Sequence, residues 1–399
     1  MVRNNDNDIV IIAAKRTAVG SHGGSLKNFS PTDLGVIAAQ AALDQIQLDK
    51  KLINHIIFGN VLPVNGQGLY LPRHVGLSIG LNVETPALLV SRMCNSGYQA
   101  IISGSQQLLL KEAEFVLSGG SESMSQAPFL AEGHRWGNKL GDCILRDELV
   151  DVLTDGYIDT PMAITAEELA NRHKISREEC DSFALESQNK AMNAIKSNRF
   201  HEELTPITIK GKGGKEAIFI TDEHPRFNTT LETLAKLKPV FKKDGVVTAG
   251  NASGIGDGAA AIILTTNKNA RKMNIKPLAK IISWGISGCD PHIMGIGVVG
   301  ATKIALKKAD LSLKDIDLFE INEAFASQYL SVEKELKLDR EKVNTNGGAI
   351  ALAHPVGCTG VKLTVTLLHE LIKRNAEYGL TSACAGGGQG TAIIIKNLT

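Results

Sequence analysis

ALDQIQLDKKLI, at residues 42–53, matches ALKKADLSLKDI, at residues 305–316, when the sequence is shifted by 263 positions. Each stretch has the pattern of a helix end, a short turn and the start of a strand. The same shift places Ser96-Gly97 over Thr359-Gly360, and each pair opens a further helix-like stretch. This self-similarity predicts two halves built on one plan. The residues that coincide are Leu43 with Leu306, Leu48 with Leu311, Lys51 with Lys314 and Ile53 with Ile316.

Around the two matching stretches, short apolar runs alternate with helical patterns, which predicts a fold of the α/β class. The helix after Ser30 has a clear start signal, because Ser30 can cap it, Pro31 suits the first position and Asp33 lies in the first turn. The expected strands cover residues 9–14, 56–61, 115–118, 279–283, 318–321 and 392–396.

The middle of the chain differs from both ends, because it is polar and irregular. It contains one charged helix pattern at residues 166–196 and a turn-like glycine segment at 211–214. Such insertions often cover a ligand site. A strand at 259–264 is expected to return the chain to the first half. The expected division is an N-terminal half (1–120), an inserted loop domain (121–247), a return strand (248–270) and a C-terminal half (271–399).

The composition excludes several classes of protein. The chain has 399 residues, too many for one hydrophobic core. Its 43 basic residues balance 42 acidic ones, so the chain has no strong electrostatic field that would favour binding to nucleic acid or to an anionic membrane. No apolar run reaches the roughly 18 residues of a membrane span. Six scattered cysteines without a Cys-x-x-Cys pair argue against zinc and disulfides and favour a reducing compartment. The first eight residues resemble neither a secretory signal nor a transit peptide, so a soluble cytoplasmic protein is expected.

Cys94 lies between an apolar run at residues 87–90 and a helix-like stretch that begins at Ser96. The positive end of a helix dipole and unpaired backbone N–H groups stabilise a thiolate, which predicts a nucleophile at this position. The alternative is a cysteine that only packs as a small hydrophobe. His354 and Cys384, far downstream in glycine-dense segments, could carry protons for acyl chemistry.

Four further segments have polar residues where a site could form. Cys384 stands in a glycine run at 382–390 that leaves the backbone open to a ligand, although a plain turn explains part of it. Asn322 follows the expected strand at 318–321, where α/β sites assemble, or else it caps the next helix. His354 alone would be a structural hydrogen bonder, and residues 251–258 could be only a loop. The other cysteines, at 143, 180, 289 and 358, are expected to be structural.

Two segments look like nucleotide-binding motifs, but the residues around them exclude this function. Gly295, Gly297 and Gly300 match the dinucleotide fingerprint, but residues 284–294 separate the first glycine from its strand. The Gly213-Gly214-Lys215 segment lacks the Walker spacing and the following Ser or Thr.

In combination, these motifs make the chain resemble the thiolase family along nearly its whole length. Within the family it is similar to 3-ketoacyl-CoA thiolases of the mitochondrial type, with which it shares segments at 161–163 and 287–297. Acetoacetyl-CoA-specific members usually carry a histidine where this chain has Pro161. It also departs from the family at Asn95, Tyr98 and Ala353. The matching motifs lie at 90–97, 119–125, 250–254 and 322–325, in the His354-Pro355 loop and in the Cys384 glycine run.

The resemblance implies two related βαβαβαββ halves in a five-layer α-β-α-β-α sandwich, with an inserted loop domain for coenzyme A. It implies a homodimer or homotetramer that binds acyl-CoA and CoA, with no nucleic acid or membrane partner. Coenzyme A is then a substrate, with no tightly bound cofactor and no metal. The expected location is the cytoplasm in a bacterium or the mitochondrial matrix in a eukaryote.

The resemblance also implies the chemistry. Cys94 attacks the 3-keto carbonyl of a 3-ketoacyl-CoA after His354 takes its proton, and C–C cleavage leaves an acyl-enzyme. Cys384 protonates the departing acetyl-CoA enolate and takes a proton in the reverse Claisen reaction. One oxyanion is stabilised by His354 with a water on Asn322, and another by the N–H groups of Cys94 and Gly386. Family positions for CoA are Arg226, Thr229 and Ser253, and those for the acyl pocket are Met162, Ala324 and Phe325.

Three alternatives stay open. The first is an acetoacetyl-CoA-specific acetyl-CoA C-acetyltransferase. The second is a condensing ketosynthase-like enzyme, which would have a second histidine or an asparagine in place of Cys384. The third is a non-catalytic CoA-thioester-binding subunit, which would be expected to lack Cys94 or Cys384.

Overall fold

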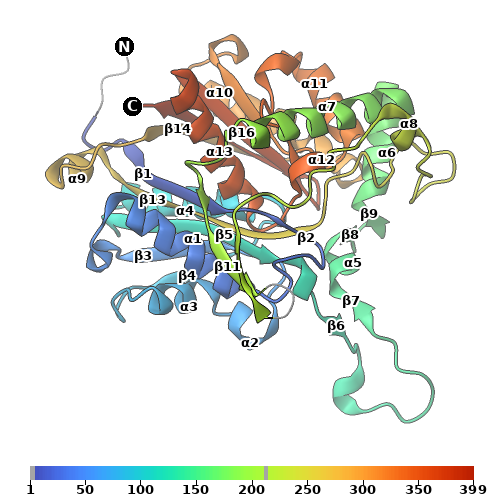
Figure 1. Ribbon diagram of the computed structural model, residues 1–399, viewed down its shortest axis with the longest axis horizontal. Helices are drawn as coiled ribbons and strands as arrows, with labels where there is room; N and C mark the ends of the chain where they lie inside the picture. Colours follow the sequence, from blue (N-terminus) through green and yellow to red (C-terminus); the bar gives the residue numbers. More distant parts are fainter. Residues whose placement is uncertain (1–4, 211–213) are drawn as a thin grey trace.

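The computed structural model describes residues 5–210 and 214–399 (Figure 1). Eleven strands form one mixed sheet, whose main path is β15-β16-β17-β14-β1-β13-β5-β3-β4. β14 and β1 pair only through Val10 with Lys280 and Ile11 with Ala279, so the sheet divides there into two. The N-terminal sheet contains β1 (Ile9–Thr17), β13 (Gly256–Thr266), β5 (Phe115–Ser123), β3 (His55–Gly59) and β4 (Ala87–Val90), with β2 (Gly20–Ser21) and β10 (Leu204–Thr205) alongside; the C-terminal sheet contains β14 (Ala279–Gly288), β17 (Gln389–Asn397), β16 (Tyr378–Ala385) and β15 (Leu318–Ile321).

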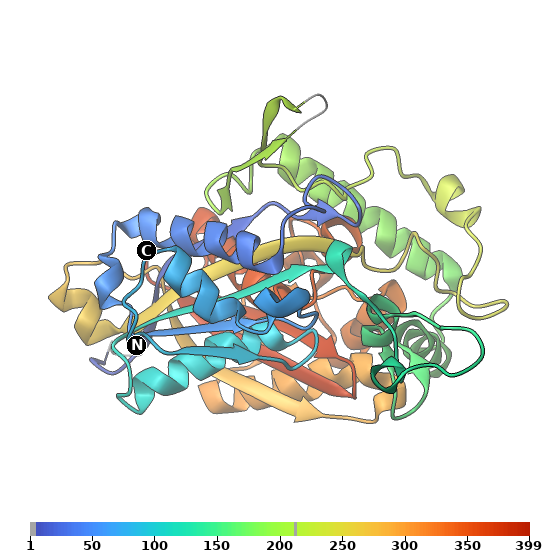
Figure 2. The same ribbon diagram turned by 90° about the horizontal axis from the view of Figure 1, so that it is seen from below.

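Helices cover both sheets and fill the space between them. α4 (Ser96–Leu109) and α13 (Thr359–Arg374) pack in one apolar cluster with strands of both sheets. Figure 2 shows α1 and α10 on opposite faces of the molecule. The architecture is therefore the expected five-layer α-β-α-β-α sandwich. The outer helices are α1 (Pro31–Ile46) and α3 (Leu71–Ser78) on the N-terminal sheet, and α10 (Gly297–Ala309) and α11 (Ala326–Leu336) on the C-terminal sheet.

The local sequence explains these elements. β5 and most of β13 are buried on both faces, which suits their continuous runs of apolar and small residues. α1 begins with the predicted capping box, because Ser30 Oγ accepts from the Asp33 N–H (3.1 Å) and Asp33 accepts from the Ser30 N–H (2.9 Å). The expected strands are present, and several extend further than predicted.

The two halves repeat each other in space as well as in sequence. β3 begins at His55 and β15 at Leu318, β5 at Phe115 and β16 at Tyr378, and α4 at Ser96 and α13 at Thr359. Each pair of starting residues is 263 positions apart (318 − 55, 378 − 115 and 359 − 96), which confirms the predicted duplication.

The two central helices touch backbone to backbone at their N-termini. A Cβ atom added to Gly97 would lie 2.8 Å from the Val361 nitrogen and 3.0 Å from the Gly360 nitrogen. No side chain fits into such a contact, and backbone atoms cannot move aside. The glycines therefore allow the first turns of α4 and α13 to meet at the centre of the molecule.

The longest elements of the insertion between the halves are helices. The predicted helix at 166–196 is in fact two helices, α6 (Met162–His173) and α7 (Arg177–Lys196). Lys174 adopts a left-handed conformation (φ +51°) that ends α6, and Ser176 starts α7 with its own capping box. Of the expected glycine turn, residues 211–213 lie outside the described chain. Smaller elements are α5 (Glu148–Val152), α8 (Leu231–Ala235), β6 (Phe129–Leu130), β7 (Arg146–Asp147), β8 (Thr154–Asp155), β9 (Thr160–Pro161), β11 (Ile207–Lys210) and β12 (Glu216–Phe219), and outside the insertion α2 (Asn65–Gly68), α9 (Asn267–Lys272) and α12 (Ala349–Leu352).

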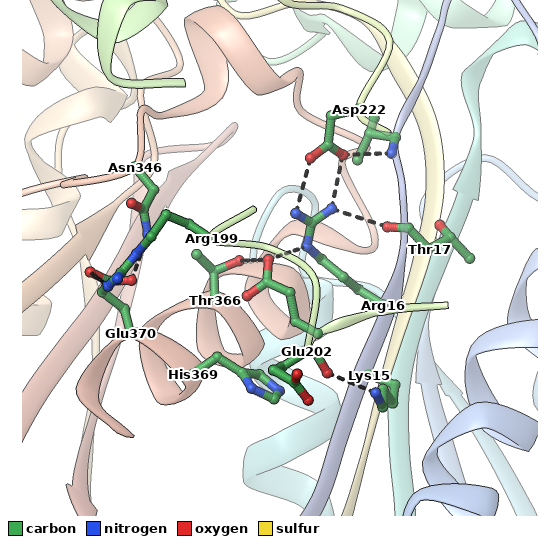
Figure 3. Close-up of polar contacts among 12 residues, drawn as sticks. Lys15, Arg16, Thr17, Arg199, Glu202, Asp222, Asn346, Thr366, His369 and Glu370 are labelled. Carbon is green, nitrogen blue, oxygen red and sulfur yellow. Dashed lines mark hydrogen bonds and ion pairs between the residues drawn. The ribbon is translucent and has the colours of Figure 1, made fainter. Parts of the chain in front are cut away.

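A buried ion cluster ties the insertion to the N-terminal sheet (Figure 3). Arg16 of β1 is fully buried, and its guanidinium group contacts Glu203 (2.6 Å) and both carboxylate oxygens of Asp222 (2.8 and 3.0 Å). β10 also pairs with β1 beside Arg16. Two distant points of the insertion are thereby fixed to one strand. Within residues 5–210 and 214–399, no helix is long and apolar enough to cross a membrane.

The glycine contact between the central helices gives a test of the fold. Gly97→Ala should lower the free energy of unfolding by about 3 kcal/mol, because the added methyl group overlaps backbone atoms that cannot repack. Gly66→Ala in α2 is the matched control, since a Cβ there meets nothing within 4 Å, and it should leave stability nearly unchanged. Urea unfolding compares the two variants. Equal stability of both would show that the contact is not a constraint.

Candidate active site

Cys94 lies in a tight turn between β4 and α4. Ser96 holds this turn, because its Oγ accepts from the Arg92 N–H (2.9 Å) and donates to the Met93 carbonyl (2.6 Å). Met93 adopts a left-handed φ of +48°, which is uncommon for a residue with a long side chain. The turn therefore places the thiol at the start of the helix, as the sequence predicted.

The predicted stabilisation of the Cys94 thiolate is wrong for this structure. Burial is the main cause that raises the pKa of the thiol to about 11, and the nearby Glu122 carboxylate contributes to this rise. Hydrogen bonds from the backbone N–H groups of Gly386 and of Cys94 itself lower the pKa, but they do not offset the loss of water. Cys94 is thus a neutral thiol at rest and needs a base. The same two N–H groups can stabilise negative charge close to the sulfur.

His354 comes from the other half of the molecule, in the loop between α12 and α13. Its N–H donates to the Gly254 carbonyl (2.8 Å), and Nδ1 lies 2.6 Å from Thr359 Oγ1. The Thr359 hydroxyl donates to the Pro355 carbonyl (3.0 Å), so it accepts from the Nδ1–H group of the ring. This arrangement assigns the proton to Nδ1 and leaves a lone pair on Nε2.

The Nε2 atom of His354 faces Asn322. Asn322 Nδ2 lies 3.4 Å from Nε2, and the Asn322 N–H donates to the Ser382 carbonyl (2.9 Å). Burial is the main cause that lowers the pKa of His354 to about 3, and Lys362 contributes to this fall, so the ring is neutral. Asn322 does not cap α11, whose N-cap is Phe325. Asn322 Oδ1 is buried and has no hydrogen-bond partner in the described part of the chain.

Cys384 lies near the end of β16, paired with Gly390 of β17. Burial raises the pKa of its thiol, and Cys94 and Cys289 are close enough to raise it further. The strands turn through Gly387 (φ +81°) and Gly388 (φ +75°), which explains the glycine run. The Cys289 N–H donates to the Gly388 carbonyl (2.7 Å), so a cysteine expected to be structural lies beside the site.

The residues expected to form the acyl pocket lie on the Cys384 side. A Cβ atom on Gly386 would be 3.3 Å from Met162 Sδ. Met162 and Ala324 belong to the apolar cluster that includes Cys384, and Phe325 packs against it. Cys94 instead packs against a second cluster, which the sequence did not reveal because Leu62 and Leu149 stand in no motif. This second cluster consists of Leu62, Met124, Leu149 and Val356.

The residues expected to bind CoA lie on two neighbouring loops. The Ser253 N–H donates to the Ala324 carbonyl (2.9 Å), which places Ser253 next to the site. Arg226 and Thr229 share one turn, closed by a hydrogen bond from Thr229 Oγ1 to the Arg226 carbonyl (2.8 Å). His224 connects this turn to the Ser253 loop, since a Cβ atom on Gly254 would lie 2.6 Å from its Cδ2. Arg226 is exposed, and burial lowers the pKa of His224.

Two departures from the family pattern form contacts between the halves. Asn95 is fully buried, and its surroundings orient the amide so that it donates to the Ala383 carbonyl (3.0 Å) and accepts from the Thr391 N–H (3.3 Å). The Tyr98 hydroxyl lies 2.5 Å from Thr381 Oγ1. Both residues therefore connect the start of α4 to the C-terminal sheet.

The remaining candidates lie outside the site or serve packing. A 3₁₀ helix at Pro291–Ile296 separates β14 from α10, as expected from the failed dinucleotide fingerprint. Gly297 packs on β17, where its Cβ would be 2.9 Å from the Gly390 nitrogen. All six cysteines are free thiols; Cys143 is exposed, and Cys180 and Cys358 are buried. Within the described ranges, no cluster of three or more His, Cys, Asp or Glu side chains could hold a metal ion.

Family profiles match both halves of the chain. The thiolase N-terminal domain matches residues 9–268, and the thiolase C-terminal domain matches residues 275–397.

Relatives match over almost the whole length. The mitochondrial 3-ketoacyl-CoA thiolase of Homo sapiens is 53% identical over 390 residues, which is 98% of each chain. An acetyl-CoA acetyltransferase of Pseudomonas aeruginosa is 47% identical, covering 97% of this chain and 99% of the relative. The crystal structure of the human mitochondrial enzyme in complex with CoA superposes with a TM-score of 0.96 at 51% identity, covering 100% of both chains. On this similarity, and with two thiols, a neutral histidine and an asparagine brought together from both halves, the chain belongs to the thiolase family.

Proposed function

We propose that the chain is a thiolase that converts a 3-ketoacyl-CoA and CoA into acetyl-CoA and a shortened acyl-CoA, reversibly. The observation that carries this proposal is that Cys94 lies close enough to Cys384 to raise the pKa of the Cys384 thiol. The neutral ring of His354 faces Asn322, whose N–H group donates to the carbonyl of Ser382, two residues before Cys384. The names of the human and Pseudomonas relatives support it. CoA acts as a substrate, with no tightly bound cofactor.

In the first half-reaction, Nε2 of His354 accepts the Cys94 proton as the sulfur attacks the 3-keto carbonyl. The new oxyanion lies against the N–H groups of Gly386 and Cys94, which already contact the sulfur. Expulsion of the acetyl-CoA enolate breaks the Cα–Cβ bond and leaves an acyl group on Cys94. His354 and a water held by Asn322 stabilise the enolate oxygen.

Cys384 completes the first half-reaction by giving its proton to the enolate carbon. Its raised pKa suits an acid that stays protonated until the enolate forms. The Cys384 thiolate then takes the proton of the CoA thiol as CoA attacks the acyl-enzyme, and protonated His354 returns its proton to the departing Cys94 sulfur. In the Claisen direction, Cys384 removes the α-proton of acetyl-CoA.

We also propose that residues 121–247 form the domain that covers CoA, while 1–120 with 248–270 and 271–399 form the two halves. Arg226 would contact the nucleotide end of CoA, and Thr229 and Ser253 its pantetheine side. Support comes from the exposed position of Arg226 and from His224, which brings the Arg226–Thr229 turn onto the Ser253 loop.

A homodimer or homotetramer is the proposed assembly. β4 is the edge strand of the N-terminal sheet, and Leu88 on it is exposed. The arm from β6 to β7 extends away from the body (Figure 1). Exposed apolar residues on the arm are Phe129, Leu130, Trp136, Leu140, Ile144 and Leu145.

The proposed location depends on the source of the protein. The human relative is named mitochondrial, which supports the mitochondrial matrix if the source is a eukaryote. If the source is a bacterium, the proposed location is the cytoplasm.

The division of labour between the cysteines gives the first test of function. Incubation with acetyl-CoA should acetylate Cys94, which peptide mapping by mass spectrometry would locate. Cys384→Ser should keep this acetylation but lose thiolysis of acetoacetyl-CoA by at least 100-fold, because a hydroxyl group is a poorer proton carrier than a thiol. Cys94→Ser should lose both activities.

Cys143→Ser is the control, since this exposed cysteine lies outside the site and its loss should change neither activity. Acetylation at Cys384, or normal thiolysis by Cys384→Ser, would overturn the assignment of roles.

The range of substrates gives a second test. Pro161 precedes Met162, which lies beside Gly386, so a histidine at position 161 would place a bulky polar group near the acyl site. The wild type should accept chains longer than acetoacetyl, with kcat/KM rising several-fold per added carbon pair, since each buried methylene contributes about 0.8 kcal/mol at best. kcat/KM is compared for acetoacetyl-CoA, 3-ketohexanoyl-CoA and 3-ketooctanoyl-CoA. Activity confined to acetoacetyl-CoA would favour the acetoacetyl-CoA-specific alternative.

The buried neutral histidine predicts the dependence of stability on pH. The pKa of His354 is about 3 in the folded protein and about 6.5 in the unfolded chain, so only the unfolded chain binds this proton between those values. The contribution of His354 to the free energy of unfolding is therefore fully present above pH 6.5 and is lost as the pH drops. Between pH 7 and pH 5, the wild type should lose about 2 kcal/mol more than His354→Asn in urea unfolding. Equal losses in the free energy of unfolding of the wild type and of His354→Asn would contradict burial of the neutral ring.

A further inference from the structure

We propose that Glu122 is a positioning residue that fixes the base His354 relative to the nucleophile Cys94. This inference rests on the proposed thiolase function and gives a role to the Gly-Gly-Ser-Glu segment at 119–122, which the mechanism leaves unused. Glu122 is fully buried near the end of β5.

The carboxylate of Glu122 joins two loops from different halves. Oε2 accepts from the N–H groups of Gly357 (2.8 Å) and Val61 (3.0 Å). Oε1 accepts from Asn60 Nδ2 (2.6 Å) and the Leu62 N–H (3.1 Å). All four partners are donors, which matches the ionised form of the side chain. Burial raises the pKa of Glu122 to about 8 although the backbone N–H groups of Leu62, Val61 and Gly357 lower it, so the ionised form predominates above pH 8.

The two loops that Glu122 joins lead to the two reacting groups. Gly357 follows His354 by three residues, in the loop closed by the Thr359 and Pro355 contact. Residues 60–62 follow β3, and Leu62 belongs to the apolar cluster against which Cys94 packs. The carboxylate therefore links the loop that contains His354 to the apolar cluster against which Cys94 packs.

The neighbouring glycines allow this link. Gly120 faces the same side of β5 as Glu122, and a Cβ atom there would lie 2.9 Å from the Cys358 Cα. A Cβ atom on Gly357 would lie 2.7 Å from the Asn60 Cα. The His354 loop thus packs directly on the sheet, and Glu122, two residues further along the strand, accepts its N–H group.

Glu122 acts through other residues and not on the substrate. Its two oxygens already accept four hydrogen bonds from the protein, which fills their usual capacity. It contributes a fixed geometry and, above its pKa of about 8, a negative charge, which raises the pKa of the Cys94 thiol. Because a misplacement of about 1 Å can slow catalysis by about 100-fold, loss of the link should appear in kcat.

The test compares Glu122→Gln and Glu122→Asp with Glu370→Gln. Glu370 is equally buried and accepts from Arg199 (2.6 Å) and Asn346 (2.8 Å), but it lies about three helical turns beyond Thr359 on α13. Active sites are counted by acetyl label on Cys94, so that kcat is expressed per folded, competent site. This count separates a positioning effect from partial unfolding.

Glu122→Gln should lower kcat for thiolysis about 100-fold per labelled site with less than a threefold change in the KM for CoA, because an amide nitrogen opposes two of the N–H donors. Glu370→Gln should stay within twofold of the wild type. Loss of the charge should also move the pH midpoint of Cys94 alkylation by iodoacetamide to lower pH in Glu122→Gln. Glu122→Asp keeps the charge but is too short to reach both loops, so its midpoint should stay while kcat falls.

Two results would overturn the proposal: a normal kcat per labelled site in Glu122→Gln, or equal falls in kcat in Glu122→Gln and Glu370→Gln. Failure of the wild type to become acetylated would refute the thiolase function itself. The alkylation profile does not need turnover, so it distinguishes the two failures.

Discussion

The contact between Gly97 and Gly360 is the constraint on which the site depends. Because two helix N-termini meet backbone to backbone, the turn before α4 and the loop before α13 must lie beside each other. Cys94 precedes α4 by two residues and His354 precedes α13 by five, so the duplication places one of the proposed reacting groups in each half. Neither half holds the pair alone. The C-terminal sheet then adds Cys384 at the end of β16 and Asn322 after β15.

This central position determines the protonation states. Desolvation raises the pKa of Cys94 and lowers that of His354, so both groups are neutral at rest. Proton transfer is therefore tied to carbon–sulfur bond formation, because a separated ion pair would be costly in this environment. The N–H groups of Gly386 and Cys94 already point at the sulfur and need no reorganisation to stabilise an oxyanion.

The sequence predicted the plan of the molecule better than its details. The repeat, the Ser30 capping box and the position of Cys94 at the start of α4 follow from local signals. The joint role of Cys94, His354 and Cys384 stays a prediction from motif order. The break between α6 and α7 was missed because a left-handed Lys174 carries no signal as clear as glycine. The thiolate prediction failed because it counted the helix dipole and omitted desolvation, which depends on distant strands. The apolar cluster behind Cys94 and the partners of Glu122 likewise depend on segments that only folding brings together.

Backbone strain shows how firmly the site is held. Ala353, directly before His354, adopts φ +62° and ψ +169°, a region that favours glycine and costs about 1–3 kcal/mol for other residues. Met93, directly before Cys94, is also left-handed. Such conformations persist only where surrounding contacts determine them. Three contacts determine the conformation around His354. The His354 N–H group donates to the Gly254 carbonyl, and the ring contacts the Thr359 hydroxyl. Glu122 accepts from the N–H group of Gly357, three residues further along the loop. Three independent anchors, one from each neighbouring segment, therefore hold the base in a conformation that the loop alone would not adopt.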